Sequence, residues 1–262
     1  MNDARFASAF DSVADEYERG RPGYPAAALD AVTRELDLSP RSQVIDLAAG
    51  TGKLTRDLAE RFDRVVAIEP LAEMRAQLEH NLPQVEALDG TAERMPVADA
   101  RADAIFVAQA FHWFDGSRAL TEIARVLRPG GGLALLWNTT PWERRETPWF
   151  ARLDDVLERS RADLSTLHRH ASGRWQEVFD GETRFTPLAG AAFDNTQRMS
   201  PEDFLAGFES RSYVAVLDAA DRAAVMADAG ELLENDDAPL EDGHVVVPMQ
   251  TACFWTRLTA AQ

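Results

Sequence analysis

Residues 43–52 read Gln43-Val-Ile-Asp-Leu-Ala-Ala-Gly-Thr-Gly52, a short apolar run that ends in a turn with two glycines. A helical pattern follows at once, since residues 54–61 carry apolar side chains at the spacing of one helix face. Gly50 and Gly52 have no side chain, so the backbone can turn sharply there and approach a ligand closely. A strand, a glycine turn and a helix in this order predict the first unit of a doubly wound α/β fold.

The same alternation continues as far as Trp137. Apolar runs predict further strands at 64–68, 84–88, 102–108 and 132–137, and helical spacing predicts helices at 72–82 and 117–127. Short strands that alternate with amphipathic helices predict a parallel sheet with right-handed crossovers and helices on both faces. The fold class is therefore α/β.

The flanking segments are less regular. Upstream, helices are expected at 10–17 and 26–36, separated by the breaker Gly20-Arg-Pro-Gly-Tyr-Pro25. Downstream, Ser200 is expected to cap a helix that begins at Pro201, a second helix is expected at 218–233, and a strand at 244–254. Pro248 within that strand indicates an edge or a bulge. We divide the chain into N-terminal helices (1–39), a ligand-binding core (40–138) and a remainder (139–262).

Composition narrows the classes of partner. The 262 residues carry a formal net charge of −17 and no basic run, which favours a small-molecule ligand over nucleic acid. The single cysteine, Cys253, cannot form an internal disulfide or a cysteine-based zinc site. No apolar run reaches the roughly 20 residues that span a bilayer, and the N-terminus lacks a signal-peptide pattern. We therefore expect a cytoplasmic protein.

An acidic residue follows the second predicted strand. Glu69 lies 17 residues beyond Gly52, where a carboxylate can accept hydrogen bonds from the ribose of an adenosine cofactor. A nicotinamide dinucleotide site usually has a third glycine three residues further on, and here that position holds Thr55. Asp46 is poorly suited to a pyrophosphate and better suited to a cationic ammonium group. A nicotinamide-dependent oxidoreductase is thus the less favoured alternative.

Five motifs occur in a characteristic order: Asp46-x-x-x-Gly50-x-Gly52, Glu69, Gly90-Thr-Ala-Glu-Arg-Met-Pro96, His112-Trp-Phe114 and Leu127-Arg-Pro-Gly-Gly131. Together they resemble the class I S-adenosylmethionine-dependent methyltransferases, in particular the small-molecule branch called methyltransferase type 11. The resemblance implies a Rossmann-like, doubly wound, seven-stranded sheet whose last strand, at 244–257, is antiparallel. It also implies a helical cap insertion at about 139–180 and 200–240.

The resemblance further implies roles in binding S-adenosylmethionine. The methionine part would contact the turn, the ribose would bind Glu69, and the adenine would lie beside the third motif. The residues so implied are Asp46, Ala48, Gly50, Gly52, Glu69, Pro70, Met74, Thr91, Ala92 and Gln109, with Tyr17 and Arg21 closing the pocket. Two positions depart from the family pattern. Ala48 stands where a glycine is usual, and Thr91 stands where an acid is common.

The acceptor side is less defined. His112 is a candidate general base because its side chain titrates near neutrality, and a histidine that only shapes the pocket is the alternative. Further candidates for contact with the acceptor are Trp113, Arg174, Arg211 and Tyr213, although an aromatic core is equally consistent with that segment. We expect methyl transfer to O, N or C of a small molecule, without a metal. A non-catalytic protein that binds S-adenosylmethionine is the second alternative.

Overall fold

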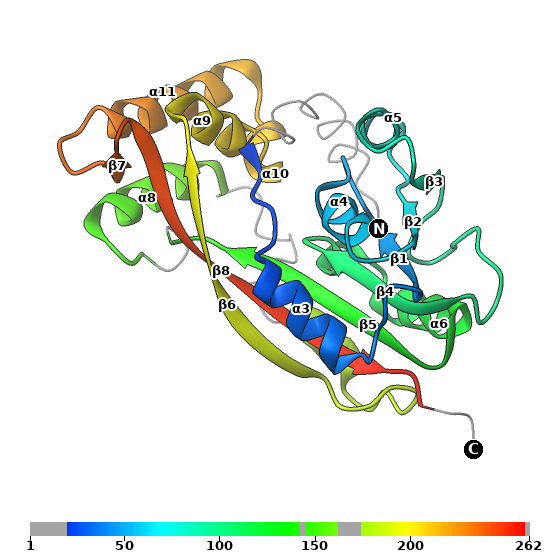
Figure 1. Cartoon of the computed structure of the whole chain (residues 1–262). Helices are drawn as coiled ribbons and strands as arrows, with labels where there is room; N and C mark the ends of the chain where they lie inside the picture. Colours follow the sequence, from blue (N-terminus) through cyan, green and yellow to red (C-terminus); the bar gives the residue numbers. More distant parts are fainter. Residues whose placement is uncertain (1–19, 142–144, 162–173, 260–262) are drawn as a thin grey trace.

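The structure is a computed structural model that describes residues 20–141, 145–161 and 174–259. Its centre is a single mixed sheet with the strand order β3-β2-β1-β4-β5-β8-β6, and β7 pairs with β8 outside this path (Figure 1). The strands are β1 (Gln43–Leu47), β2 (Arg64–Ile68), β3 (Glu86–Leu88), β4 (Ala102–Ala108), β5 (Leu127–Thr139), β6 (Ala189–Met199), β7 (Leu240–Glu241) and β8 (His244–Arg257). Strands β1 to β5 are parallel, and β8 is antiparallel to both of its long neighbours, β5 and β6.

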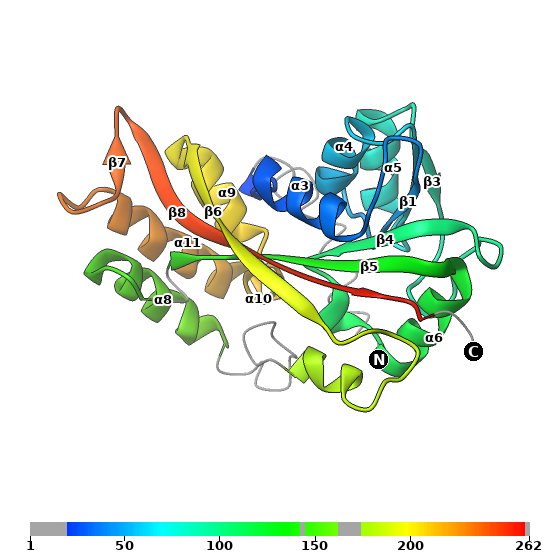
Figure 2. The ribbon, with the colours of Figure 1, turned by 60° about the horizontal axis from the view of Figure 1, so that its bottom comes forward.

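Helices cover both faces of the sheet, as the doubly wound fold requires (Figure 2). One face carries α3 (Ala26–Glu35), α4 (Lys53–Ala59) and α5 (Ala72–Asn81), and the other carries α6 (Gly116–Val126). The short 3-10 helices η1 (Phe111–Trp113) and η3 (Arg174–Phe179) join the α6 face. The Rossmann-like fold expected from the motifs is therefore confirmed.

The local sequence patterns predicted the bounds of most of these helices and strands correctly. Strands β1, β2 and β4 have the predicted bounds, and helices α4, α5 and α6 begin and end within two residues of the predictions. β5 differs, because it begins at Leu127 rather than at residue 132. Its register against β4 shifts between Ala102 and Ala104, so the Arg-Pro-Gly-Gly segment joins the sheet through an irregularity instead of lying outside it.

β6 was not predicted. It pairs with β8 along its whole length, from Ala189 opposite Trp255 to Met199 opposite Val245. Its side chains are mostly exposed, so the strand lacks the apolar pattern by which a buried strand is recognised. The prediction for β8 is confirmed, including its antiparallel direction. Pro248 pairs with Thr196 on one side only, because β5 ends opposite Gln250, and it thus lies at a local edge.

A second group of helices packs where β8 extends beyond β5 (Figure 1). We call these the cap helices: α8 (Pro148–Arg161), α9 (Pro201–Glu209), α10 (Ser212–Ala215) and α11 (Ala219–Leu233). As predicted, Ser200 caps α9, accepting the amide N–H of Asp203 on its hydroxyl, and Pro201 is the first helical residue. No helix in the part of the chain that the structure describes is long and apolar enough to cross a membrane.

Candidate functional site

The glycine turn after β1 has an alternating backbone conformation. Ala48, Gly50 and Gly52 all have positive φ, at 58°, 58° and 91°. At Gly52 an added Cβ would also crowd Leu78 of α5, at a distance of 3.0 Å. At Gly50 an added Cβ would meet only Met74, at 3.9 Å from its sulfur. The backbone conformation at Gly50 therefore favours glycine, and Met74 is the only described side chain within 4 Å of an added Cβ there.

Glu69 lies beside this turn and is buried, with 4% of its surface exposed. Its Oε2 accepts the amide N–H of Gly50 at 2.8 Å, and its Oε1 accepts the amide N–H of Leu71 at 2.9 Å. These two bonds fix the carboxylate of Glu69 beside the backbone of the turn, at the end of the second strand, where nucleoside-binding α/β folds place an acid. This geometry suits the ribose of a nucleoside.

Asp46, at the end of β1, is 1% exposed. Its Oδ2 accepts the hydroxyl of Thr55 at 2.6 Å, whereas its Oδ1 has no hydrogen-bond partner among the described residues. Burial, together with the nearby charge of Glu69, raises the pKa of Asp46 to about 7, although the Thr55 bond opposes the shift. A buried carboxylate oxygen without a partner is costly, and a cationic ligand group would satisfy it. Thr55 occupies the position where a dinucleotide site has its third glycine. Its hydroxyl is thus the group that holds the carboxylate of Asp46.

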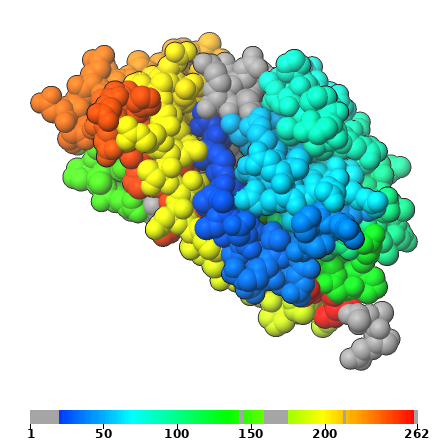
Figure 3. Space-filling model, in the orientation of Figure 1, coloured from blue at the N-terminus to red at the C-terminus, as the bar shows by residue number. Residues whose placement is uncertain are grey.

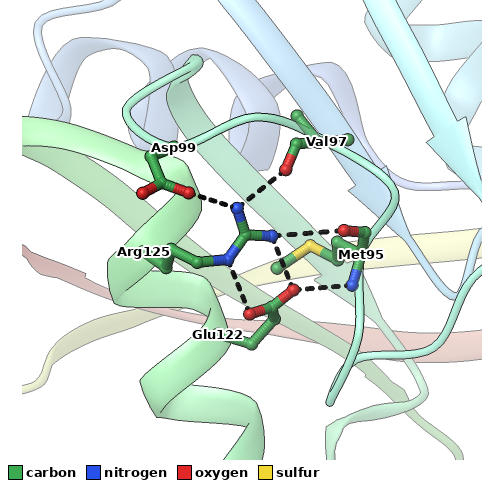
Figure 4. A network of polar contacts seen from close by, with 5 residues as sticks. All are labelled: Met95, Val97, Asp99, Glu122 and Arg125. Atoms are coloured by element: carbon green, nitrogen blue, oxygen red, sulfur yellow. Dashed lines mark hydrogen bonds and ion pairs between the residues drawn. The ribbon is translucent and has the colours of Figure 1, made fainter.

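The third motif forms a loop between β3 and β4 that is fastened to α6. Thr91 and Arg94 form a short antiparallel bridge, and Ala92 is buried against the sheet core. The guanidinium of Arg125 donates to the backbone carbonyls of Met95 and Val97 and to two carboxylates (Figure 4). This arrangement fixes the loop that carries Thr91 and Ala92, the residues implied to flank the adenine.

Two further implied residues lie close to the turn. Met74 is buried next to Gly50, and Pro70 is exposed directly after Glu69, while their contacts with the cofactor stay predictions. Gln109 follows β4 with a φ of 58°, and its backbone N–H bonds to the carbonyl of Leu136. Its side chain donates to the carbonyl of Asn138 at 3.3 Å. Gln109 therefore joins the ends of β4 and β5 at the edge of the sheet where β1 ends.

His112 and Trp113 follow on η1, at the same carboxyl edge. Both are half-buried, and their ring centroids lie 4.9 Å apart. The indole N–H of Trp137, on β5, donates to Nδ1 of His112 at 3.4 Å. Beyond the end of β4, the Nδ1 atom of His112 is thus hydrogen-bonded to a side chain of the neighbouring strand β5.

Comparison with known proteins gives a consistent result. A family model described as a methyltransferase domain matches residues 45–135. An uncharacterized methyltransferase from Mycobacterium tuberculosis is 37% identical over 247 residues, which cover 93% of each chain. The chain belongs to the class I S-adenosylmethionine-dependent methyltransferases.

Two more comparisons agree with this membership. An uncharacterized methyltransferase-like protein from Schizosaccharomyces pombe is 32% identical over 241 residues, or 91% of each chain. The solved structure of a protein classed as a type II methyltransferase, from Anaeromyxobacter dehalogenans, superposes with a TM-score of 0.60 at 26% identity. It covers 92% of this chain and 97% of its own. The methyltransferase is thus related to these proteins over nearly its whole length.

The segment at residues 20–25 crosses this methyltransferase between the cap helices and the glycine-turn side, and we call it the strap (Figure 3). Arg21 donates from Nε to the hydroxyl of Ser210 at 3.2 Å and from Nη2 to its carbonyl at 3.1 Å. Gly20 packs so closely on Gly207 of α9 that a Cβ on either residue would overlap the other's backbone. The structure therefore places Arg21 against the cap, and its contact with the cofactor stays a prediction.

The strap is held a second time at Gly23, by residues that the sequence did not single out. The side-chain amides of Asn138 and Asn195 both donate to the Gly23 carbonyl at 3.1 Å. Thr251 completes the network by donating to the side-chain oxygen of Asn138 at 2.5 Å. These three side chains come from β5, β6 and β8 and meet only because the three strands are neighbours in the sheet.

The remaining acceptor-side candidates stay predictions. Arg211 is half-buried and lines a cavity of about 20 Å³ between the strap, α9 and β8, which holds about one water molecule and no acceptor. Arg174 begins η3 and Tyr213 lies in α10, but their side chains, like the whole of Tyr17, lie outside the described residues. Among the residues described, no cluster of three or more His, Cys, Asp or Glu side chains forms a possible metal site.

Proposed function

We propose that this methyltransferase transfers the methyl group of S-adenosylmethionine to O, N or C of a small-molecule acceptor. The observation that carries the proposal is the pair of buried carboxylates around the turn. Asp46 keeps an oxygen without a hydrogen-bond partner among the described residues, which suits the ammonium of the methionine part. Glu69 is a buried carboxylate held beside Gly50, and a carboxylate in this position after the second strand suits the hydroxyls of a ribose.

The other cofactor contacts follow from the same edge of the sheet. Met74 would lie beneath the ribose, Thr91 and the backbone of Ala92 would flank the adenine, and Gln109 would lie below the methionine part. Ala48 would add a methyl group beside the methionine part of the cofactor. Gly52, at the start of α4, would also lie near the methionine part, and Pro70 would lie beside the ribose. Arg21 and Tyr17 would close the pocket from the strap side.

S-adenosylmethionine, when bound, supplies a sulfonium methyl group that is already activated. The work left to the protein is orientation of the acceptor in a dry pocket, which can lower the barrier by several kcal/mol. His112 and Trp113, beyond the end of β4, are proposed to contact the acceptor. The further candidates are Arg174 at the start of η3, Arg211 between α9 and α10, and Tyr213 in α10. The net charge of −17, without a basic run, supports a small acceptor over a nucleic acid.

The nicotinamide alternative is opposed by Thr55. Where a dinucleotide site has its third glycine, the Thr55 hydroxyl bonds to Asp46, and a carboxylate there would face the pyrophosphate. A thermal-shift experiment separates the two cofactors. S-adenosylmethionine and S-adenosylhomocysteine should each raise the melting temperature, whereas NAD(H) should not. Stabilisation by NAD(H) alone would overturn the proposal.

Two variants sharpen the experiment. Glu69→Gln should abolish most of the stabilisation, with a loss of affinity of about tenfold or more, because it removes a charge-assisted acceptor of the ribose hydroxyls. Glu73→Gln removes a charge from an exposed position on the neighbouring helix α5 and should leave the stabilisation unchanged. Transfer of labelled methyl groups to the small molecules of a cell extract then distinguishes an enzyme from a protein that only binds the cofactor.

A further inference from the structure

We propose that Trp137 fixes His112 in the neutral form that carries its proton on Nε2, so that His112 donates a hydrogen bond to the methyl acceptor and does not act as its general base. The inference rests on the proposed function, because it concerns the same acceptor site. Trp137, on β5, is then a positioning residue. Of the roles considered for His112, general base is replaced by hydrogen-bond donor.

The position of the Trp137 indole is fixed by packing. The residue is 1% exposed, and its ring lies 4.3 Å from that of Trp175 and 5.9 Å from that of Phe254. A buried indole N–H needs an acceptor, and the indole has no acceptor of its own to offer. In this structure the acceptor is Nδ1 of His112, at 3.4 Å. The direction of the hydrogen bond is thus determined by chemistry, from Trp137 to His112.

That direction determines the form of the imidazole. A ring nitrogen that accepts a hydrogen bond carries no proton, so the proton of neutral His112 lies on Nε2. A second proton would have to be placed on Nδ1, against the indole N–H. A general base needs a ring nitrogen with a lone pair toward the acceptor, and in this form Nε2 already carries hydrogen. His112 is therefore suited to donate a hydrogen bond through Nε2.

The class of acceptor follows from this role. An oxygen or nitrogen that already has its electron pair at neutral pH, such as an oxyanion or a neutral amine, needs no base before it attacks the methyl carbon. An oxygen on that acceptor can receive the Nε2 hydrogen bond and be held in line. The bond between acceptor and carbon then forms as the bond between carbon and sulfur breaks, its electron pair passes to sulfur, and any proton that the product must lose passes to water.

The form of His112 can be measured without cofactor or acceptor. In the protein labelled with ¹⁵N-histidine, two-dimensional NMR distinguishes a protonated from an unprotonated ring nitrogen, and His112→Gln identifies the signals of His112. We expect Nε2–H to dominate in the wild-type protein at pH values where the ring is neutral. In Trp137→Phe, which keeps an aromatic ring but loses the N–H, the preference should fall. Trp175→Phe removes an indole from the same cluster but leaves the Trp137 bond in place, and should leave the preference unchanged.

A dominant Nδ1–H signal in the wild-type protein, or a preference that Trp137→Phe leaves intact, would overturn the proposal. Methyl transfer gives a second measurement, with labelled S-adenosylmethionine and a cell extract as the source of acceptor. The amide nitrogen of Gln reaches about as far as Nε2, whereas that of Asn reaches only as far as Nδ1. His112→Gln should therefore keep at least about tenfold more activity than His112→Asn, and equal loss in both would contradict a donor role. Failure of the proposed function would appear separately, as absence of stabilisation by S-adenosylmethionine.

Discussion

Arg125 and Glu122 lie one turn apart on α6 and form a two-point ion pair, with N–O distances of 2.8 and 2.6 Å. The same guanidinium donates to the carbonyls of Met95 and Val97, and Glu122 accepts the amide N–H of Met95 at 2.8 Å. The pair lowers the pKa of Glu122, mainly through its hydrogen bond to Arg125. Two charged side chains of one helix thus hold the backbone of the loop that carries Thr91 and Ala92, the residues proposed to flank the adenine.

Arg125→Met should loosen this loop. Because the bonds to the backbone are charge-assisted but partly exposed, we expect a loss of roughly 1–3 kcal/mol of unfolding free energy and a several-fold weaker affinity for S-adenosylmethionine. Chemical denaturation and calorimetric titration measure the two effects. Arg152→Met is the matched control, since Arg152 bonds only to the exposed Asp237 in the contacts seen here. It should cost under about 1 kcal/mol and leave affinity unchanged. Equal affinity in both variants would contradict the anchoring role.

Asp46 should make cofactor binding depend on pH. Its pKa is raised to about 7 in the protein without ligand, and the ammonium of S-adenosylmethionine binds best to the ionised form. Affinity should therefore rise by roughly tenfold per pH unit below about pH 7 and level off above it. Titrations should stay below about pH 7.5, where the ligand's α-amino group keeps its proton.

Asp46→Asn is the control for the pH dependence of cofactor binding. It should weaken cofactor binding but stabilise the unliganded protein above pH 7. A raised pKa means that the contribution of Asp46 to stability is full below its ordinary pKa of 3.8 and is lost as the pH rises through about 7. Above pH 7 the unliganded Asn variant should thus melt at a higher temperature than the wild-type protein. Its affinity for S-adenosylmethionine should be lower by about tenfold or more and flat with pH. A variant that keeps the pH dependence would assign it to another group.

Ala48 adopts a left-handed backbone conformation, with φ of 58°, in which a non-glycine residue is strained. Ala48→Gly should remove the strain and raise the free energy of unfolding by about 0.5–1 kcal/mol, despite the added flexibility of glycine in the unfolded chain. The neighbouring Ala49→Gly relieves no such strain and removes a methyl group that packs against the Leu78 cluster, so it should destabilise. Urea denaturation of both variants measures the difference, and a destabilised Ala48→Gly would contradict the strain.

Gly207 should tolerate no side chain. A Cβ at this position of α9 would lie 2.3 Å from the carbonyl oxygen of Gly20, so Gly207→Ala must displace the strap and should cost about 1–3 kcal/mol. Gly230, in α11, has no atom within 4 Å of an added Cβ, and Gly230→Ala should stabilise by about 0.5–1 kcal/mol. Thermal unfolding of the two helix variants should therefore shift in opposite directions.

The proximity of Glu69 to the glycine turn could be predicted from the sequence because it depends on local structure. Asp46, Gly50 and Gly52 lie within one turn of chain, and Glu69 follows the next strand, so their spacing alone brings them together. The role of Thr55 could not be predicted from local spacing. The sequence showed only that a glycine was missing, whereas the structure shows that the Thr55 hydroxyl holds Asp46.

The position of the strap and the bond between Trp137 and His112 depend on contacts between residues that are distant in the sequence. Asn138, Asn195 and Thr251 belong to three strands and meet through the register of β8, which no local pattern specifies. β6 itself was missed because an exposed edge strand carries little apolar periodicity. Trp137 could be recognised as buried in a strand, but its bond to His112 depends on how β4 and β5 are aligned.

The position of β8 between β5 and β6 has a consequence for synthesis on the ribosome. Among the described residues β6 pairs only with β8, and β8 begins 45 residues after β6 ends. During translation, β6 must therefore wait, unpaired, until the segment at 244–257 has left the exit tunnel. The parallel strands β1 to β5 can pair earlier, so a nascent chain that stops before β8 should hold the glycine turn but present an open edge at β5, where chaperones can bind.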